Sequence, residues 1–259
     1  MIAIIDYNAG NIRSVENALA RLGCEYELTA DPSRIRAADK VILPGVGNAA
    51  AAVSELRERG LVPVILSLRR PVLGICVGLQ VLCRDSEEGP CEGLGLFDAH
   101  VRRFPTEPRQ MPLPLTGSEK DPCRGMLPAS DRSTCPNGRM RGQGQPDSGS
   151  IPREGSFLLP ESGCSCPAVE RPAAKVPHMG WNAIGNLDGK LFKDLKGGAN
   201  VYFVHSYYPT LGPDTIATCR HGDILFSAAL KYENFYGTQF HPEKSGAVGE
   251  RILRNFLGL

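Results

Sequence analysis

The sequence predicts an α/β fold with a doubly wound, mostly parallel sheet, followed by an antiparallel meander near the carboxyl end. Short apolar runs alternate with helix-like segments over residues 1–100, and closely spaced β-type runs fill the chain from residue 200 onward. Residues 105–174 carry neither pattern. We therefore expect a single domain over residues 1–259, interrupted by an insertion at 105–174.

The amino-terminal half repeats a strand, a turn and a helix. The apolar runs are residues 2–6, 41–43 and 71–75. The helical segments that follow them are residues 12–22, 49–59 and 77–84. Short apolar runs of this kind are typical of strands that are buried on both faces. The repetition predicts right-handed crossovers and a parallel sheet with helices on both sides.

The carboxyl-terminal part predicts strands joined by tight turns. The candidate strands are residues 201–208, 215–220, 224–232 and 235–240, and a helix is expected over 247–256. Gly, Asp, Asn and Pro separate these runs, and such spacing is typical of an antiparallel meander.

The insertion at 105–174 has the composition of a disordered segment. It holds 12 of the 21 prolines and 8 of the 29 glycines, but only one aromatic residue, Phe157. Such a stretch cannot bury enough apolar surface to offset its chain entropy. We therefore expect it to be disordered. An alternative origin also stays open, in which residues 105–174 are a read-through intervening segment and not native coding sequence. Removing it leaves 189 residues, a comfortable single domain.

Composition excludes several classes of protein. With 29 basic and 28 acidic residues, the chain has no bulk field for nucleic acid or anionic lipid. The longest apolar stretch, residues 61–68, is far shorter than the ~20 residues of a membrane helix. Nine cysteines without a C-x-x-C pair argue against both a disulfide framework and a zinc ribbon. Because the first residues carry no basic leader, we expect a cytoplasmic protein. We also expect it to use no metal and no cofactor.

One cysteine differs from the others. Cys76 lies within the string G-I-C-V-G-L-Q, residues 74–80, between a predicted strand and a predicted helix. A glycine two residues before and after a nucleophile is the pattern of a nucleophile elbow, whose sharp turn crowds the backbone. The helix start favours a thiolate, and the Val77 N–H could serve an oxyanion. From this string alone, a buried structural cysteine is an equal alternative.

A cysteine nucleophile needs a base and a group that orients the base. His241 is followed two residues later by Glu243, in the string G-T-Q-F-H-P-E at a predicted strand end. The turn P-G-V-G at residues 44–47 also follows a strand, and its glycines permit a peptide N–H to face an oxyanion. In parallel sheets, active sites form beyond the carboxyl ends of the strands, where all three motifs are expected to meet.

Together these motifs resemble the triad class of glutamine amidotransferases (class I). More narrowly, several strings are similar to the glutaminase subunits of imidazole glycerol phosphate synthases: D-Y-N-A-G-N at 6–11, K-V-P-H-M-G-W-N at 175–182 and Y-F-V-H-S-Y-Y at 202–208. The resemblance covers the whole chain except 105–174. In the family a short connection stands in place of this insertion.

The resemblance implies a mechanism. Cys76 attacks the carboxamide of glutamine, and His241, oriented by Glu243, donates a proton to the departing ammonia and then activates water. The implied oxyanion groups are Val77, Gly45 and Val46. The implied glutamine contacts are Gln80, Gly47, Ser206 and Tyr207.

The resemblance also implies a partner. Ammonia would pass to a cyclase subunit with a (β/α)8 barrel, which makes imidazole glycerol phosphate and an aminoimidazole carboxamide ribotide in histidine biosynthesis. The heterodimer face would include Asn11, Trp181 and Lys244. A core position for Trp181, the only tryptophan, and a merely solvated charge for Lys244 stay open.

Three other functions stay open. The chain could be the glutaminase subunit of another amidotransferase, serving anthranilate, guanylate or pyridoxal phosphate synthesis. It could be a stand-alone Cys hydrolase or chaperone-like protein with the same elbow. It could also be a non-catalytic scaffold for a cyclase. Gln80 and the H-P-E string favour a glutaminase over a hydrolase, and K-V-P-H-M-G-W-N favours the imidazole glycerol phosphate class.

Overall fold

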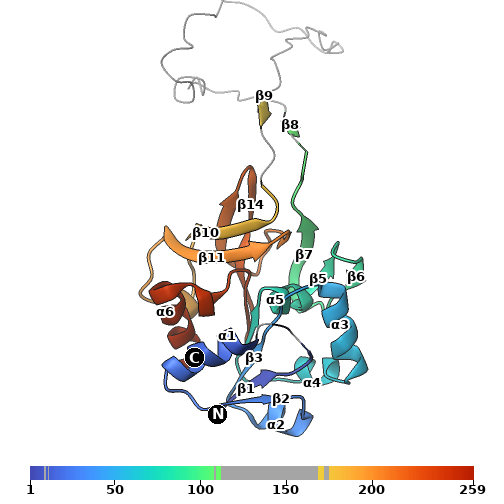
Figure 1. Ribbon diagram of the computed structural model, residues 1–259, viewed down its shortest axis with the longest axis vertical. Helices are drawn as coiled ribbons and strands as arrows, with labels where there is room; N and C mark the ends of the chain where they lie inside the picture. The colour runs from blue at the N-terminus through green and yellow to red at the C-terminus, as the bar shows by residue number, and fades with distance from the viewer. Residues whose placement is uncertain (9, 11, 108, 112–168, 172–174) are drawn as a thin grey trace, which may run out of the picture. The chain divides into compact units, whose positions relative to one another are not determined.

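The computed structural model describes residues 1–8, 10, 12–107, 109–111, 169–171 and 175–259, and Figure 1 shows its ribbon. The chain divides into two units, Met1–Arg109 with Arg171–Leu259 and Gln110–Glu170. Of the second unit, only parts of two short paired strands are described, β8 (Arg109–Met111) and β9 (Val169–Arg171). The predicted disorder of 105–174 therefore concerns residues that lie largely outside the described ones.

The first unit is built on a nine-stranded sheet with the order β11-β10-β13-β14-β15-β4-β3-β1-β2. Its parallel half consists of β2 (Tyr26–Thr29), β1 (Ile2–Ile5), β3 (Lys40–Leu43), β4 (Val72–Ile75) and β15 (Phe235–Thr238). All residues of β1, β4 and β15 are buried, as expected for strands covered on both faces. The predicted parallel sheet is confirmed.

Helices follow these strands and cover both faces of the sheet. They are α1 (Ile12–Arg21), α2 (Pro32–Ala37), α3 (Ala49–Glu58), α4 (Val62–Leu66), α5 (Val77–Leu82) and α6 (Gly246–Leu257). In Figure 1, α1 and α6 lie on one side of the sheet, and α3 and α4 lie on the other. Asp31 and Asn48 cap the amino ends of α2 and α3, each accepting a backbone N–H with its side chain.

The other half of the sheet is antiparallel, as predicted, but it also contains β10, which is not among the predicted strands and lies between β11 and β13. It contains β14 (Ile224–Tyr232), β13 (Thr215–His221), β10 (His178–Gly185) and β11 (Ala199–His205), each antiparallel to its neighbours. The predicted strand over 201–208 is wrong in one respect. The chain leaves the large sheet at Ser206, and β12 (Tyr207–Pro209) pairs with a different sheet.

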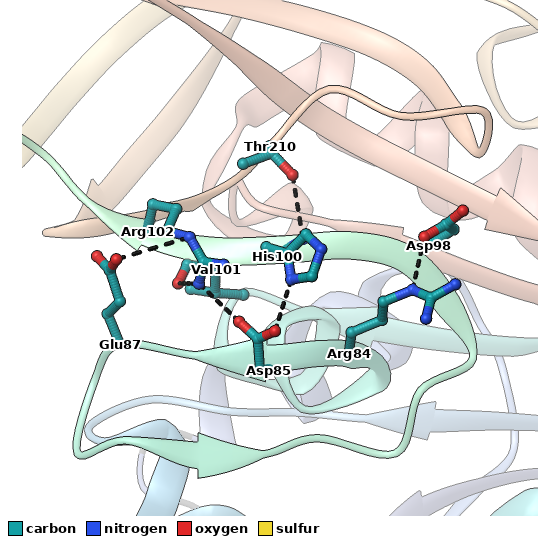
Figure 2. Close-up of polar contacts among 8 residues, drawn as sticks. All are labelled: Arg84, Asp85, Glu87, Asp98, His100, Val101, Arg102 and Thr210. Atoms are coloured by element: carbon teal, nitrogen blue, oxygen red, sulfur yellow. Dashed lines mark hydrogen bonds and ion pairs between the residues drawn. The ribbon is translucent and has the colours of Figure 1, made fainter.

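That second sheet has the order β12-β7-β5-β6, with β5 (Cys83–Ser86), β6 (Cys91–Glu92) and β7 (Phe97–Arg103). Figure 2 shows the polar network on it, in which the carboxylate of Asp85 lies between the side chains of His100 and Arg102. The predicted helix over 77–84 is therefore too long. It ends at Leu82, because Cys83 pairs with Phe97 and starts a strand.

Among the residues that the structure describes, no helix is long and apolar enough to span a bilayer.

Candidate active site

Cys76 sits on a sharp turn between β4 and α5. Its φ is +54°, a left-handed value that is uncommon for a residue with a side chain. Backbone hydrogen bonds hold it on both sides, because its N–H donates to Thr238 O at 2.8 Å and its carbonyl accepts from Gln80 N at 3.1 Å. The strain is stored in a well-tethered turn, which is the geometry expected of a nucleophile elbow.

Three glycines let other segments approach this turn closely. A Cβ at Gly78 would lie 2.0 Å from Leu43 O, and a Cβ at Gly45 would lie 2.4 Å from Gly78 N. A Cβ at Gly74 would lie 2.7 Å from Gly78 O. The turn after β3 therefore lies directly against the backbone after Cys76, and no residue larger than glycine fits these positions without movement.

The side chains of His241 and Glu243 form a buried pair at the end of β15. His241 Nδ1 is 2.8 Å from Glu243 Oε1, and both side chains are only 2% exposed. Burial disfavours the imidazolium, but the neighbouring Cys76 sulfur and the Glu243 carboxylate outweigh it and raise the pKa of His241 to about 9. Cys76, His241 and Glu243, the three residues predicted to act together, are thus brought together.

The thiol of Cys76 has two further polar neighbours. It lies 4.0 Å from Val204 O, and Gln239 Nε2 donates to the sulfur at 3.6 Å. His241 Nε2 is buried and makes no hydrogen bond within the described part of the chain, so it is free to exchange a proton with a reacting group.

Of the predicted oxyanion groups, Gly45 in the turn after β3 lies beside Val77. A Cβ at Gly45 would come within 2.9 Å of Val77 Cβ, so the turn and the start of α5 are in contact. Before the turn, the buried hydroxyl of Tyr7 donates to Pro44 O at 2.5 Å. Gly47 has a φ of +92° and open space around it.

Two of the predicted glutamine contacts, Gln80 and Tyr207, are joined by a hydrogen bond next to the elbow. Gln80 is 3% exposed, and its Nε2 donates to Tyr207 O at 3.1 Å. Its Oε1 is buried and without a hydrogen-bond partner among the described residues. Ser206 and Tyr207 are half-buried where β11 gives way to β12. Gln80 Oε1 is thus an unpaired buried acceptor next to the elbow.

Two of the three predicted interface residues lie near His241. Trp181 is 59% exposed, which rules out the alternative of a core position, and its ring contacts Tyr202 edge to face. Tyr202 O accepts the N–H of His241 at 2.9 Å, and half-buried Lys244 donates its N–H to His241 O. Asn11 lies outside the described residues.

Sequence reasoning did not assign a role to Gln239 or Tyr7, although both touch the site. Gln239 lies two residues before His241, but its partner Gln80 is 159 residues away in the sequence. No local pattern reveals such a contact. The one available signal is the polar side chain of Gln239 within the strand predicted over residues 235–240.

Comparison with known proteins assigns the class. Residues 3–258 match the family model described as glutamine amidotransferase class-I, so the chain belongs to this family. It is 41% identical to an imidazole glycerol phosphate synthase subunit HisH of Bacteroides fragilis, over 100% of this chain and 99% of that one. It is 36% identical to the HisH subunit of Escherichia coli K12, over 99% and 98% of the two chains.

Solved structures agree on the fold. A crystal structure of a putative GMP synthase component from Thermoplasma acidophilum aligns with a TM-score of 0.56 at 18% identity, over 99% of this chain and 92% of the other. A crystal structure of a glutamine amidotransferase aligns with a TM-score of 0.57 at 16% identity, over 100% and 98%. At these identities the likeness concerns the fold alone.

Proposed function

We propose that this chain is the glutaminase subunit of an imidazole glycerol phosphate synthase. It would hydrolyse glutamine to glutamate and ammonia, and a cyclase subunit would consume the ammonia in histidine biosynthesis. The observation that carries the proposal is the thiol of Cys76 on a strained turn beside the buried His241–Glu243 pair. The names of the full-length relatives support the choice of this protein over other amidotransferases.

The raised pKa of His241 favours an imidazolium beside the sulfur of Cys76 at neutral pH. The thiolate attacks the side-chain carbonyl carbon of glutamine, and a tetrahedral oxyanion forms. His241 then donates its proton to the departing nitrogen, so that ammonia leaves and a γ-glutamyl thioester remains. Neutral His241 next takes a proton from water, which attacks the thioester, and glutamate departs as the thiolate and imidazolium return.

Glu243 orients the imidazole in both steps. Its Oε1 holds His241 Nδ1–H, which leaves Nε2 to face the reacting atoms. Because the pair is buried, the carboxylate also stabilises the imidazolium more strongly than it would in water.

We assign the oxyanion hole to the Val77 N–H and an amide of the Gly45–Val46 turn. The close contact between this turn and the start of α5 supports the assignment. Gly47, with its left-handed φ and open surroundings, gives the turn room to reorient. Gln80, Gly47, Ser206 and Tyr207 are assigned to the amino-acid end of glutamine, with the unpaired Gln80 Oε1 as one acceptor.

The partner we propose is a cyclase with a (β/α)8 barrel. Trp181 and Met179, 59% and 62% exposed, form an apolar patch on β10, and Lys244 adds a positive charge nearby. An exposed Trp next to charge is typical of an interface hot spot. Asn11 belongs to the same proposed face.

All five cysteines among the described residues are free, which suits a reducing cytoplasm.

The test is glutamate release by the full chain, alone and with a cyclase and its nucleotide substrate. We expect negligible release alone and strong release with both. High basal release would favour a stand-alone hydrolase, and activation only by a different synthase would favour another amidotransferase. No release with any partner would favour a scaffold.

A matched pair of variants tests the interface. Trp181→Ala should weaken activation by the partner, whereas Leu66→Ala, an exposed apolar residue on α4, should not. Equal effects of the two substitutions would contradict the assigned face.

A further inference from the structure

A chain of hydrogen bonds between buried and half-buried polar groups runs from β10 to the thiol of Cys76. Its members come from β10, β11, β12, α5 and the segment after β15. They are Asn182, His178, His205, the carbonyl of Tyr207, Gln80 and Gln239. The proposed hydrolysis uses only Gln80 and Tyr207 of these groups, which leaves the two histidines without a role.

The outer end of this chain sets the direction of its hydrogen bonds. Asn182 Oδ1 accepts the N–H of Ala183 at 2.8 Å, and Asn182 Nδ2 donates to Arg220 O at 2.9 Å, so its amide has one possible orientation. Nδ2 also donates to His178 Nε2 at 3.1 Å. His178 therefore carries its proton on Nδ1, which donates to His205 Nε2 at 2.9 Å.

The inner end requires the same direction independently. A carbonyl can only accept, so His205 Nδ1 must donate to Tyr207 O, 2.7 Å away, and His205 Nε2 is left to accept from His178. Both rings are then neutral. Burial lowers the pKa of His178 to about 4 and that of His205 to about 3, which agrees with this assignment.

The chain continues from Tyr207 into the active site. Tyr207 O also accepts from Gln80 Nε2, which in turn donates to Gln239 Oε1 at 2.9 Å. The amide of Gln239 is thereby oriented with its oxygen toward Gln80 and its nitrogen toward Cys76 Sγ, 3.6 Å away. If this amide turned over, an oxygen lone pair would face the sulfur and would repel a thiolate.

The histidines lie in an apolar enclosure that strengthens these bonds. The ring of Phe203 stacks on His178 with a centroid distance of 4.6 Å, and the ring centroids of Phe226 and Phe104 each lie 5.3 Å from that of His205. Water has little access there, so a lost bond would leave a buried polar group unpaired.

We propose that His178 and His205 are positioning residues for the nucleophile. They hold the Tyr207 carbonyl toward Gln80, so that Gln80 fixes Gln239 with its N–H donating to the sulfur of Cys76. This proposal deepens the proposed glutaminase function and rests on it for the hydrolytic readout.

The main test uses His205→Phe in the full chain. This substitution keeps an aromatic ring but removes the donor to Tyr207 O. We expect kcat/KM for glutamine, measured with the cyclase and its nucleotide, to fall about tenfold, because the amide of Gln239 would no longer be held with its N–H toward the Cys76 sulfur. Alkylation of Cys76 by iodoacetamide, followed by mass spectrometry of its peptide, should slow in parallel at a temperature where the measured Tm shows that the variant is still folded.

Three further variants separate positioning from structure. His205→Asn keeps a donor near the place of Nδ1 and should restore much of both rates. His221→Phe is the matched control, because its ring stacks on His178 at 4.1 Å but lies outside the hydrogen-bond chain. Asn182→Asp is isosteric and replaces the donor to His178 Nε2 with an acceptor, so it should slow both rates without a cavity.

Unchanged hydrolysis and alkylation in folded His205→Phe and Asn182→Asp would overturn the proposal. So would an equal loss in His221→Phe. If the wild-type chain itself released no glutamate with its partner, the proposed function would fail, and the alkylation rates would still decide whether the histidines position the thiol.

Discussion

Gly78 lies against the carbonyl oxygen of Leu43 so closely that a Cβ on Gly78 would be 2.0 Å from that oxygen. This contact joins the end of β3 to the start of α5, and it places the Gly45–Val46 turn next to Cys76. The proposed nucleophile and the proposed oxyanion turn therefore share one close backbone contact.

Gly78→Ala should separate these two segments. We expect a loss of about 3 kcal/mol in the free energy of unfolding and a collapse of glutaminase activity, because backbone atoms cannot yield as a flexible side chain could. Urea unfolding and glutamate release measure the two effects. Gly197→Ala is the control, since nothing lies within 4 Å of its Cβ position. Normal activity in Gly78→Ala would mean that the contact is not needed.

Glu243→Gln should lower kcat for glutamine hydrolysis by about a hundredfold or more with little change in KM. The amide keeps the shape of the carboxylate, but it no longer stabilises the imidazolium of His241 or fixes its tautomer. Steady-state kinetics with the partner present provide the measurement. Glu250→Gln removes an exposed carboxylate on α6 and serves as the control. Similar rates for the two variants would argue against a role for Glu243.

The two buried histidines of the hydrogen-bond chain should make the fold sensitive to acid. Because the pKa values of His178 and His205 are lower in the folded chain, the unfolded chain binds more protons below about pH 6.5. The stability that they contribute is present above that pH and is lost as the pH falls toward about 4 and 3.

His205→Asn should therefore flatten the dependence of unfolding free energy on pH. Between about pH 4 and pH 5.5 the slope should decrease by up to about 1.4 kcal/mol per pH unit, the effect of one proton. Urea unfolding of this variant and of the wild-type chain at a series of pH values checks this. An unchanged slope would show that His205 is charged in the folded chain.

The insertion should be dispensable. Both of its flanks contact His221, because the Phe104 ring lies 5.2 Å from the His221 ring and His221 Nε2 donates to Lys175 O. A short link could therefore replace 105–174. We expect the chain with Phe104 joined to Lys175 through two glycines to keep its Tm and its coupling to the cyclase. A folded deletion variant that lost coupling would reveal a function in the insertion.

Most of the large sheet could be predicted because its strands are marked by local sequence. Residues 41–43 and 71–75 are apolar runs bounded by turn residues, and they form β3 and β4. The second sheet could not be predicted in this way. The strand Cys83–Ser86 is short and polar, and it exists because Phe97–Arg103 pairs with it and Asp85 meets His100 and Arg102 across the strands.

The same distinction applies to the site. Cys76 could be named from the sequence because glycines two residues before and after it mark a sharp turn. His241 and Glu243 could be named because a carboxylate two residues after a histidine can orient its ring. The orientation of Gln239 could not, because it depends on Gln80 and on a hydrogen-bond chain that begins at Asn182. Such contacts are set by the folded backbone and not by local spacing.

Replacement of the nucleophile tests the central claim most directly. In a complex of Cys76→Ala with the cyclase, we expect synthesis from glutamine to be abolished while synthesis from added ammonia continues at the wild-type rate. Retained glutamine-dependent synthesis, or equal loss with both nitrogen sources, would contradict the assignment of Cys76 as the residue that releases ammonia from glutamine.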